Sequence, residues 1–417
     1  MASPKRIIGF LASATFQRAV GFLMMTYLTL HLGAEEFSRY SLFLSLLVLF
    51  SGAGGLALQF APLRLSFDCR SDTERASLLK TVLIGSVVAC LSLYLFLLAL
   101  SHLTSWIPVN VLSPTELAMS GMIICGTVVY ELALTVFRYE GHIRRYAGLI
   151  AINVVLTTIF VIGFEALRGP ALTSILIGYL AALILTLAQS TYELSSRLKN
   201  GLFSKKVLTT ALHYSGPIAA HSLCIWVIQH AGRWIGTAFI SLDEIAPYLV
   251  LVQIVSVVGM LGRSIFDSAV PQIGHFIQEE TWSKIETLTW KLAAIAGTLV
   301  LIAYLGAAAL LYATPIKWPT YVVIAPKLLG LALIISLVDI MYVRGIQILQ
   351  ATKRTSAQAR LSAAAAIVVS VANLFLARQY GAIGLVWGML FGTLFLAISF
   401  NFSGLKTMNQ LRHNANA

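Results

Sequence analysis

Charge is what this 417-residue chain has least of: 11% of its residues are Asp, Glu, Lys or Arg, whereas 58% are hydrophobic. Soluble globular domains carry about a quarter charged residues, so the composition excludes that class. The chain also lacks a Walker sequence, a nucleotide-binding glycine-rich loop and any long hydrophilic segment. An ATP-driven pump in one chain and a membrane enzyme with a large extramembrane substrate site are therefore both disfavoured.

Cysteine is equally scarce, with four residues in all: Cys69, Cys90, Cys125 and Cys224. They fall in apolar stretches or in a loop expected in the cytoplasm, so we expect no disulfide. No Cys/His cluster has the spacing of metal ligands. The sequence predicts no metal site, no cofactor and no catalytic residue, and hence a protein that is not an enzyme.

Long apolar stretches fill most of the chain. There are twelve, each about 20 residues or more, which is the length a helix needs to cross a bilayer. They are too long and too uniformly apolar for a β-barrel. The sequence predicts an all-α polytopic membrane protein with twelve transmembrane helices. The expected spans are Ile7–Leu30, Phe37–Leu63, Leu79–His102, Leu117–Phe137, Ala147–Leu167, Ala171–Leu194, Leu212–Phe239, Ile245–Val270, Ile285–Leu311, Tyr321–Leu349, Leu361–Ala377 and Ile383–Leu405.

The gaps between these stretches alternate between rich and poor in Lys and Arg. One set, which includes both termini, holds 20 of the 29 basic residues, and the opposite set holds 5. Basic loops stay in the cytoplasm, so we expect both termini there. The net charge of +12 thus reflects topology and gives no reason to expect a nucleic-acid partner. The first stretch is too long for a signal peptide and is expected to remain uncleaved.

The two halves of the chain resemble each other. Glu35 and Glu36 precede an aromatic-started stretch at Tyr40, and Asp243 and Glu244 precede another at Tyr248, half a chain further on. Six spans per half make this a parallel repeat. We expect two six-helix bundles, 1–200 and 201–417, around a central cleft in which substrate is exposed to each side in turn.

Five arginines lie within the spans or at their ends. Arg18, Arg233 and Arg263 are deep, and one arginine at the bilayer centre costs roughly 2.5–3.5 kcal/mol. Arg64 and Arg344 lie near span ends, where they can either snorkel to the interface or join the deep group. A cleft lined by these residues would attract an anion, and forked guanidinium donors suit phosphate. We therefore expect all five to contribute to substrate binding, with structural pairing as the alternative.

Three acids, Glu131, Asp267 and Asp339, lie within the spans. Asp267 stands one helical turn after Arg263, at i+4, so the two are expected to pair. The three acids are candidates for carrying a coupling ion, although structural pairing is the favoured reading of Glu131 and Asp339.

Prolines interrupt or end several spans. Pro62, Pro217, Pro271 and Pro326 each remove a backbone hydrogen bond and favour a bend. They are candidate hinges for opening one half, with static kinking as the alternative.

Three regions together resemble one family. They are LGAEEFSRYSLFLSLLVLFSGAGGLAL (Leu32–Leu58), AGRWIGTAFISLDEIAPYLVLVQIV (Ala231–Val255) and ILQATKRTSAQARLSAAAAIVVSVANLFLARQYGAIGLVWGML (Ile348–Leu390). Their order and spacing, over nearly the full chain, are similar to those of Wzx-like polysaccharide and O-antigen flippases of the multidrug/oligosaccharidyl-lipid/polysaccharide exporter superfamily. One position departs from the family, which often has Asp before the arginine of the seventh span; here Gly232 precedes Arg233, so a local partner is missing.

The resemblance implies a flippase that moves undecaprenyl-pyrophosphate-linked oligosaccharide from the inner to the outer leaflet, for O-antigen or lipopolysaccharide biosynthesis. It implies that Arg18, Arg233 and Arg263 hold pyrophosphate or acidic sugar. It also implies a proton or sodium ion as the coupling partner, membrane lipids as surroundings, and a polysaccharide polymerase and chain-length regulator as possible protein partners. The alternatives are a cation-coupled multidrug or metabolite antiporter of the same superfamily and a membrane glycan polymerase or ligase.

Overall fold

The computed structural model describes residues 4–66, 68–103, 111–279, 281–313, 318–322, 326–352 and 355–416. Within these ranges the regular structure is entirely helical, as the apolar stretches predict. Each of the twelve predicted spans overlaps a helix. The α-helices are α1 (Pro4–His31), α2 (Ala34–Leu49), α3 (Pro62–Leu65), α4 (Asp72–Leu103), α5 (Pro114–Glu140), α6 (Ile143–Arg168), α7 (Leu172–Leu198), α8 (Lys205–Thr237), α9 (Leu242–Gln278), α10 (Trp282–Ala313), α11 (Pro326–Ala351) and α12 (Thr355–Asn416).

Nine helices within the described ranges are long and apolar enough to cross a membrane, judged by length and composition. The nine include α12 once, although α12 is two helices joined at a turn. The helices α1 and α8 are not among them, yet are 28 and 33 residues long. Large apolar side chains such as Leu95, Ile159 and Ile398 are more than half exposed, which suits contact with lipid. The chain is a multi-pass membrane protein.

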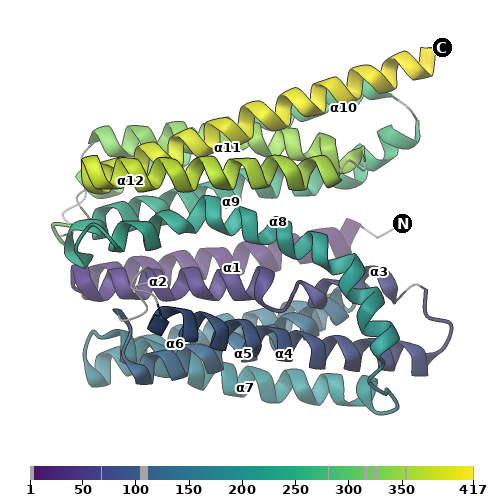
Figure 1. The fold of residues 1–417 in the computed structure, drawn as a ribbon, viewed down its shortest axis with the longest axis horizontal. Coiled ribbons are helices and arrows are strands. Elements are labelled where there is room, and N and C mark those ends of the chain that lie inside the picture. The colour runs from purple at the N-terminus through teal and green to yellow at the C-terminus, as the bar shows by residue number, and fades with distance from the viewer. Residues whose placement is uncertain are drawn as a thin grey trace. The chain divides into compact units, whose positions relative to one another are not determined.

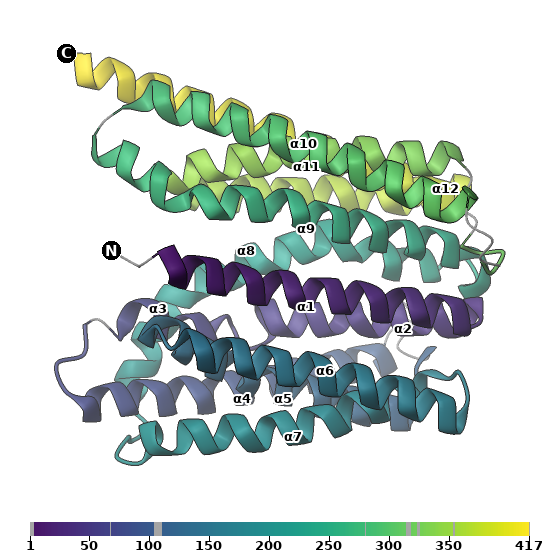
Figure 2. The same ribbon diagram turned by 180° about the vertical axis from the view of Figure 1, so that it is seen from behind.

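The chain forms two compact units, Met1–Leu223 and Cys224–Ala417. The division falls inside α8, whereas the sequence predicts a boundary at residue 200; that boundary, the internal repeat and the central cleft stay predictions. In the first unit, α6 packs against both α1 and α7 (Figure 2). Its core gathers buried side chains from several helices, among them Leu79, Phe137 and Leu149. The start of α5 is fixed by a capping box, in which Ser113 and Glu116 each accept the other's backbone N–H.

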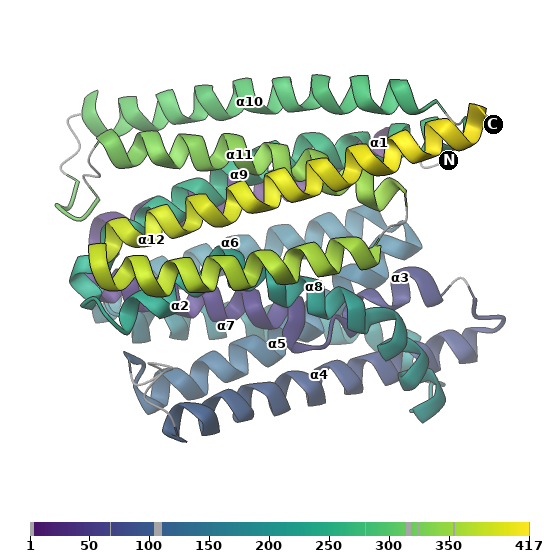
Figure 3. The same ribbon diagram turned by 45° about the horizontal axis from the view of Figure 1, so that its top comes forward.

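In the second unit, α11 packs against α9, α10 and α12 (Figure 1). Tyr342 of α11 meets Phe400 of α12 edge to face, with ring centroids 5.1 Å apart. Helix α12 turns back on itself at Gly381, where φ is 60° and ψ −139°, a conformation that favours glycine. Gly384 and Gly388 then lie against Leu376 and Asn373, so the two halves of α12 run antiparallel (Figure 3). The last two predicted spans are these two halves.

The second predicted span, Phe37–Leu63, is wrong as a single helix. Helix α2 ends at Leu49 and continues as one π-helical turn, Phe50–Gly54. Leu56 and Ala57 then have φ values of 54° and 52°, and a short 3₁₀ turn, Leu58–Phe60, precedes α3. Because the sequence stays apolar through the break, its hydropathy does not reveal the interruption.

Candidate functional site

The second unit holds an ion pair between two of the predicted site residues. Arg263 on α9 donates from Nη2 to both carboxylate oxygens of Asp339 on α11, at 3.0 Å and 3.2 Å. Its Cζ atom lies 6.0 Å from the ring centroid of Tyr342. The partner predicted from spacing, Asp267, lies on the same helix, and its side chain is outside the described residues. The prediction from spacing along one helix therefore missed Asp339, a partner on α11 that tertiary packing brings to Arg263.

Arg344 on α11 is buried, with 1% of its side chain exposed. Its Nη1 atom donates to Oδ1 of Asn401 at 2.6 Å, and its Cζ atom lies 4.0 Å from the Trp290 ring centroid. Its Nε and Nη2 atoms have no hydrogen-bond partner among the described residues. The interpretation that Arg344 snorkels to the membrane interface is therefore wrong. The guanidinium is held by an amide and an aromatic face, and retains hydrogen-bonding capacity for a further acceptor.

Asn401 is the residue that orients Arg344. Its Nδ2 atom donates to the backbone carbonyls of Met341 and Ala397, at 2.6 Å and 2.7 Å. These two bonds fix the amide so that Oδ1 faces the guanidinium. Spacing along the chain does not predict this role, because Asn401 is far from Arg344 in sequence.

Arg233 on α8 is as buried as Arg344, with 1% exposed. His230 and Tyr248 lie close enough to interact with it electrostatically. Gly232 gives Tyr248 its room: a Cβ atom on Gly232 would lie 2.5 Å from the Tyr248 hydroxyl oxygen and 3.1 Å from Nδ2 of Asn373. The space beside Gly232 is thus occupied by Tyr248 from α9.

The other predicted site residues belong to the first unit or have side chains outside the described residues. Glu131 lies on α5 in the first unit, partly exposed and near Tyr130. The side chains of Arg18 on α1, Arg64 on α3, Asp267 and Pro271 on α9, and Pro326 on α11 are outside the described residues. Pro62 and Pro326 are the first residues of α3 and α11, where proline costs no helical hydrogen bond, whereas Pro217 lies inside α8 and Pro271 inside α9. The hinge role of all four stays a prediction.

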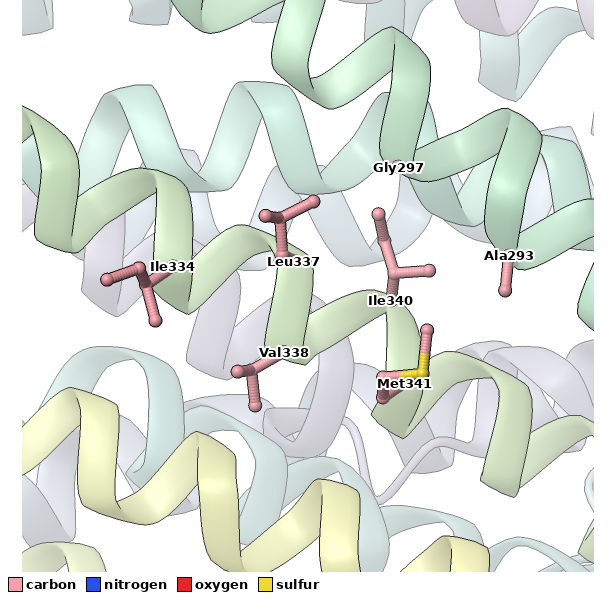
Figure 4. A pocket seen from close by; sticks show the side chains of 7 residues that line it. All are labelled: Ala293, Gly297, Ile334, Leu337, Val338, Ile340 and Met341. Carbon is pink, nitrogen blue, oxygen red and sulfur yellow. The ribbon is translucent and has the colours of Figure 1, made fainter.

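A pocket of about 300 Å³ lies between α10 and α11 (Figure 4). Its seven lining residues are apolar: Ala293, Gly297, Ile334, Leu337, Val338, Ile340 and Met341. Such a lining suits a lipid chain and does not suit an anionic head group. Val338 and Ile340 flank Asp339 in the sequence, and Arg344 follows Met341 by one helical turn.

In the first unit, an ion-pair network that the sequence pattern does not predict joins three helices. Arg39 on α2 donates to Glu36 at 2.6 Å and also pairs with Glu116 of α5. Glu36 accepts the backbone N–H of Leu172 at 2.6 Å, and Glu116 accepts the Thr173 hydroxyl at 3.0 Å, both at the start of α7. Each carboxylate thus has a structural partner, so the network fixes the ends of these helices together. Among the described residues, no group of three or more His, Cys, Asp or Glu side chains could hold a metal ion.

No protein-family model and no curated protein matches the chain. Solved structures do match. A multidrug-resistance MATE family transporter of the MOP superfamily in an inward-facing conformation has a TM-score of 0.73 at 15% identity, over 95% of this chain and 96% of that one. Such a transporter in an outward-facing conformation gives 0.62 at 16%, over 98% and 96%. A MOP superfamily transporter from Pyrococcus furiosus, described as having a binding pocket of reverse polarity that suggests a different function, gives 0.61 at 16%, over 98% and 94%. The chain therefore has the fold of the MOP superfamily transporters.

Proposed function

We propose that this protein is a transporter, not an enzyme, that moves an anionic lipid-linked oligosaccharide across the membrane by alternating access. The observation that carries the proposal is Arg344. A guanidinium that is 1% exposed, with two nitrogen atoms lacking a protein acceptor, suits a phosphate oxygen that approaches during transport. The fold supports the mechanism, because similar structures are known in inward-facing and outward-facing conformations.

The charge balance of the second unit supports an anion rather than a cation. Arg263 is paired with Asp339, whereas Arg344 contacts an amide and an aromatic ring and interacts electrostatically with Glu286. Arg233 lies beside a histidine and a tyrosine. A buried guanidinium is costly within a membrane protein, so such positions are by default candidates for functional sites. In this proposal Arg344 and Arg233 bind the pyrophosphate or acidic sugar, together with Arg18, Arg263 and Arg64.

The substrate that fits best is an undecaprenyl-pyrophosphate-linked repeat unit, such as that of an O-antigen. Its pyrophosphate supplies the anion, its tail stays in the lipid, and the apolar pocket beside α11 offers a surface for such a chain. We place the protein in the bacterial inner membrane with both termini in the cytoplasm, moving substrate from the inner to the outer leaflet. The sequence has no ATP site, so an ion gradient is the proposed driving force, with Glu131, Asp267 and Asp339 as candidate carriers.

A second candidate is a cation-coupled multidrug or metabolite antiporter. The similarity to MATE transporters favours it, because the multidrug-resistance transporter in the inward-facing conformation superposes well, with a TM-score of 0.73. The buried arginines oppose it, since a positive interior repels cationic compounds.

The test is flipping by the purified protein in proteoliposomes. Fluorescent undecaprenyl-pyrophosphate-linked disaccharide is incorporated, and a membrane-impermeant reagent measures how fast it changes leaflet. We expect flipping by the wild type, at least about ten-fold slower flipping by Arg344→Gln, and wild-type flipping by Arg378→Gln, which changes an exposed arginine. Flipping at the protein-free rate, with uptake of a cationic dye into the same vesicles, would replace this proposal by the antiporter.

A further inference from the structure

The segment that joins α7 to α8, residues 199–204, is fastened to α4 at one end of the first unit (Figure 2). We call this segment the α7–α8 loop. The backbone N–H groups of Leu202 and Ser204 donate to the hydroxyl oxygens of Ser77 and Thr81, each at 3.1 Å. Two hydrogen bonds to a long helix fix the backbone of the loop, so its side chains are presented in a set direction.

Gly201 brings the loop against the part of α4 where that helix becomes apolar. A Cβ atom on Gly201 would lie 2.3 Å from the carbonyl oxygen of Ala76, so only glycine permits this approach. The first turn of α4, residues 72–75, is polar, whereas Leu79 and Val82 belong to its apolar part. The candidate membrane span of α4 covers Asp72–Leu100. The loop therefore lies level with the boundary between the bilayer and water.

Two large apolar side chains of the loop are exposed at this boundary. Leu202 is 74% exposed and Phe203 is 44% exposed. Both are adjacent to the hydrogen bonds that fix the loop, so their exposure does not come from a loose chain. Apolar side chains held at the level of the head groups suit insertion among lipids, where their burial is favourable.

Three exposed lysines flank these apolar side chains, namely Lys199, Lys205 and Lys206. None of them forms an ion pair with a carboxylate among the residues that the structure describes. The sequence itself supplies no neutralising charge, because no acidic residue lies between Glu193 and Asp243. The surface around the loop thus combines unneutralised positive charge with an apolar tip.

We propose that the α7–α8 loop is an anchor for anionic phospholipids of the adjacent leaflet. Leu202 and Phe203 insert beside the upper part of the acyl chains, and the three lysines contact the phosphate groups. Clustered lysines at a membrane surface attract anionic lipids, and an apolar tip adds burial to that attraction. The fixed backbone strengthens binding, because no loop has to become ordered when the lipid binds.

A phospholipid fits this surface better than a soluble acidic protein does. Such a protein would meet the lysines from the aqueous side, whereas Leu202 and Phe203 lie at the depth where α4 enters the apolar region. The anchor does not depend on which substrate is transported. It also lies in the first unit, whereas Arg344 and Arg233 lie in the second.

The experiment reports from the loop itself, in the full-length protein in phosphatidylcholine nanodiscs. Leu202→Cys in a cysteine-free background is labelled with bimane, an apolar fluorophore that stands in for the leucine. Phosphatidylglycerol with a nitroxide near its head group is compared with phosphatidylcholine that carries the same nitroxide. We expect half-maximal quenching at a mole fraction about ten-fold or more lower for phosphatidylglycerol.

Removing one lysine tests the charge. Lys205→Gln should raise the mole fraction of phosphatidylglycerol needed for half-maximal quenching about five-fold, which is the effect of one lysine near an anionic surface. Lys291→Gln is the matched control, because it removes the same charge from an exposed position on α10 in the second unit. It should leave the lipid preference at the loop unchanged.

Asn200→Cys carries the same probe with Leu202 intact and gives an independent reading of the apolar tip. Adding Leu202→Ser to it should reduce quenching by both lipids, because the tip no longer inserts. Adding Leu167→Ser is the control, since Leu167 is 82% exposed but lies at the end of α6, away from the lysines.

Equal quenching by the two lipids, or an equal effect of Lys205→Gln and Lys291→Gln, would overturn the inference. Quenching by aqueous iodide but by neither lipid would also overturn it and would leave a soluble protein as the partner of this surface. Flipping without a lipid preference at the loop would overturn the anchor alone. A lipid preference without flipping would overturn the proposed function alone.

Discussion

Replacing Arg344 with methionine separates a substrate-binding role from a structural one. The change deletes the guanidinium while keeping a long apolar side chain over Trp290. It removes the charge-assisted bond to Asn401, worth about 1.5–3 kcal/mol, and a desolvated cation–π contact worth about 2 kcal/mol. It also removes the penalty of burying a charge at 1% exposure, several kcal/mol in the opposite direction.

These terms nearly cancel, so the free energy of unfolding of Arg344→Met should lie within about 2 kcal/mol of the wild-type value. Flipping of the pyrophosphate-linked lipid should nevertheless fall at least about ten-fold, because the free donors for phosphate are gone. Arg344→Lys should restore flipping only in part, since an ammonium group cannot offer the same forked donors. The assays are thermal unfolding and proteoliposome flipping on the same preparations.

The reasoning would be refuted if Arg344→Met lost stability and activity in step, with the folded fraction flipping at the wild-type rate. That result would make Arg344 a packing residue between α10, α11 and α12.

Three further outcomes follow from the site geometry. Arg263→Met should lower the free energy of unfolding by about 1–3 kcal/mol, which is less than for a fully buried pair because a third of Arg263 is exposed. Asp339→Leu added to that variant should restore the melting temperature. Equal melting temperatures of the single and the double variant would show that Asp339 gains nothing from Arg263. Gly232→Asp should lower the melting temperature because its Cβ meets the Tyr248 hydroxyl, and Tyr248→Phe in that background should recover it; failure to recover would place the clash elsewhere. Burial, reinforced by the charge of Glu74, raises the pKa of the Cys69 thiol. In a variant whose only cysteine is Cys69, maleimide labelling should therefore accelerate at a higher pH than in a variant whose only cysteine is the exposed Ser71→Cys, and coincident pH profiles would contradict the shift.

Hydropathy predicted the helices well because a bilayer demands long apolar segments whatever their packing. It could not locate the break after α2, since Gly52–Leu58 is as apolar as a continuous helix would be. The glycines of that stretch do not by themselves predict a break, and the positive φ values fall on Leu56 and Ala57, which are not glycines. The turn at Gly381 is predicted by the sequence, because the polar residues Arg378 and Gln379 precede it.

The site shows the same limit at the level of side chains. Spacing along one helix pointed from Arg263 to Asp267, yet the partner that the structure describes, Asp339, comes from α11. Arg344 was placed near a span end, where burial depends on what covers it. Trp290 and Asn401 cover it, and both are distant in sequence. Depth and charge could thus be predicted, whereas partners could not, because they are set by helix packing.

The most direct test of the central claim is the location of lipid-linked oligosaccharide in cells from which this gene has been deleted. Each face of the inner membrane is assayed separately, together with surface glycan. The account predicts loss of surface glycan, with lipid-linked repeat units retained on the cytoplasmic face, and recovery with wild type but not with Arg344→Met. Lipid-linked repeat units reaching the outer face at the normal level without this protein would contradict it.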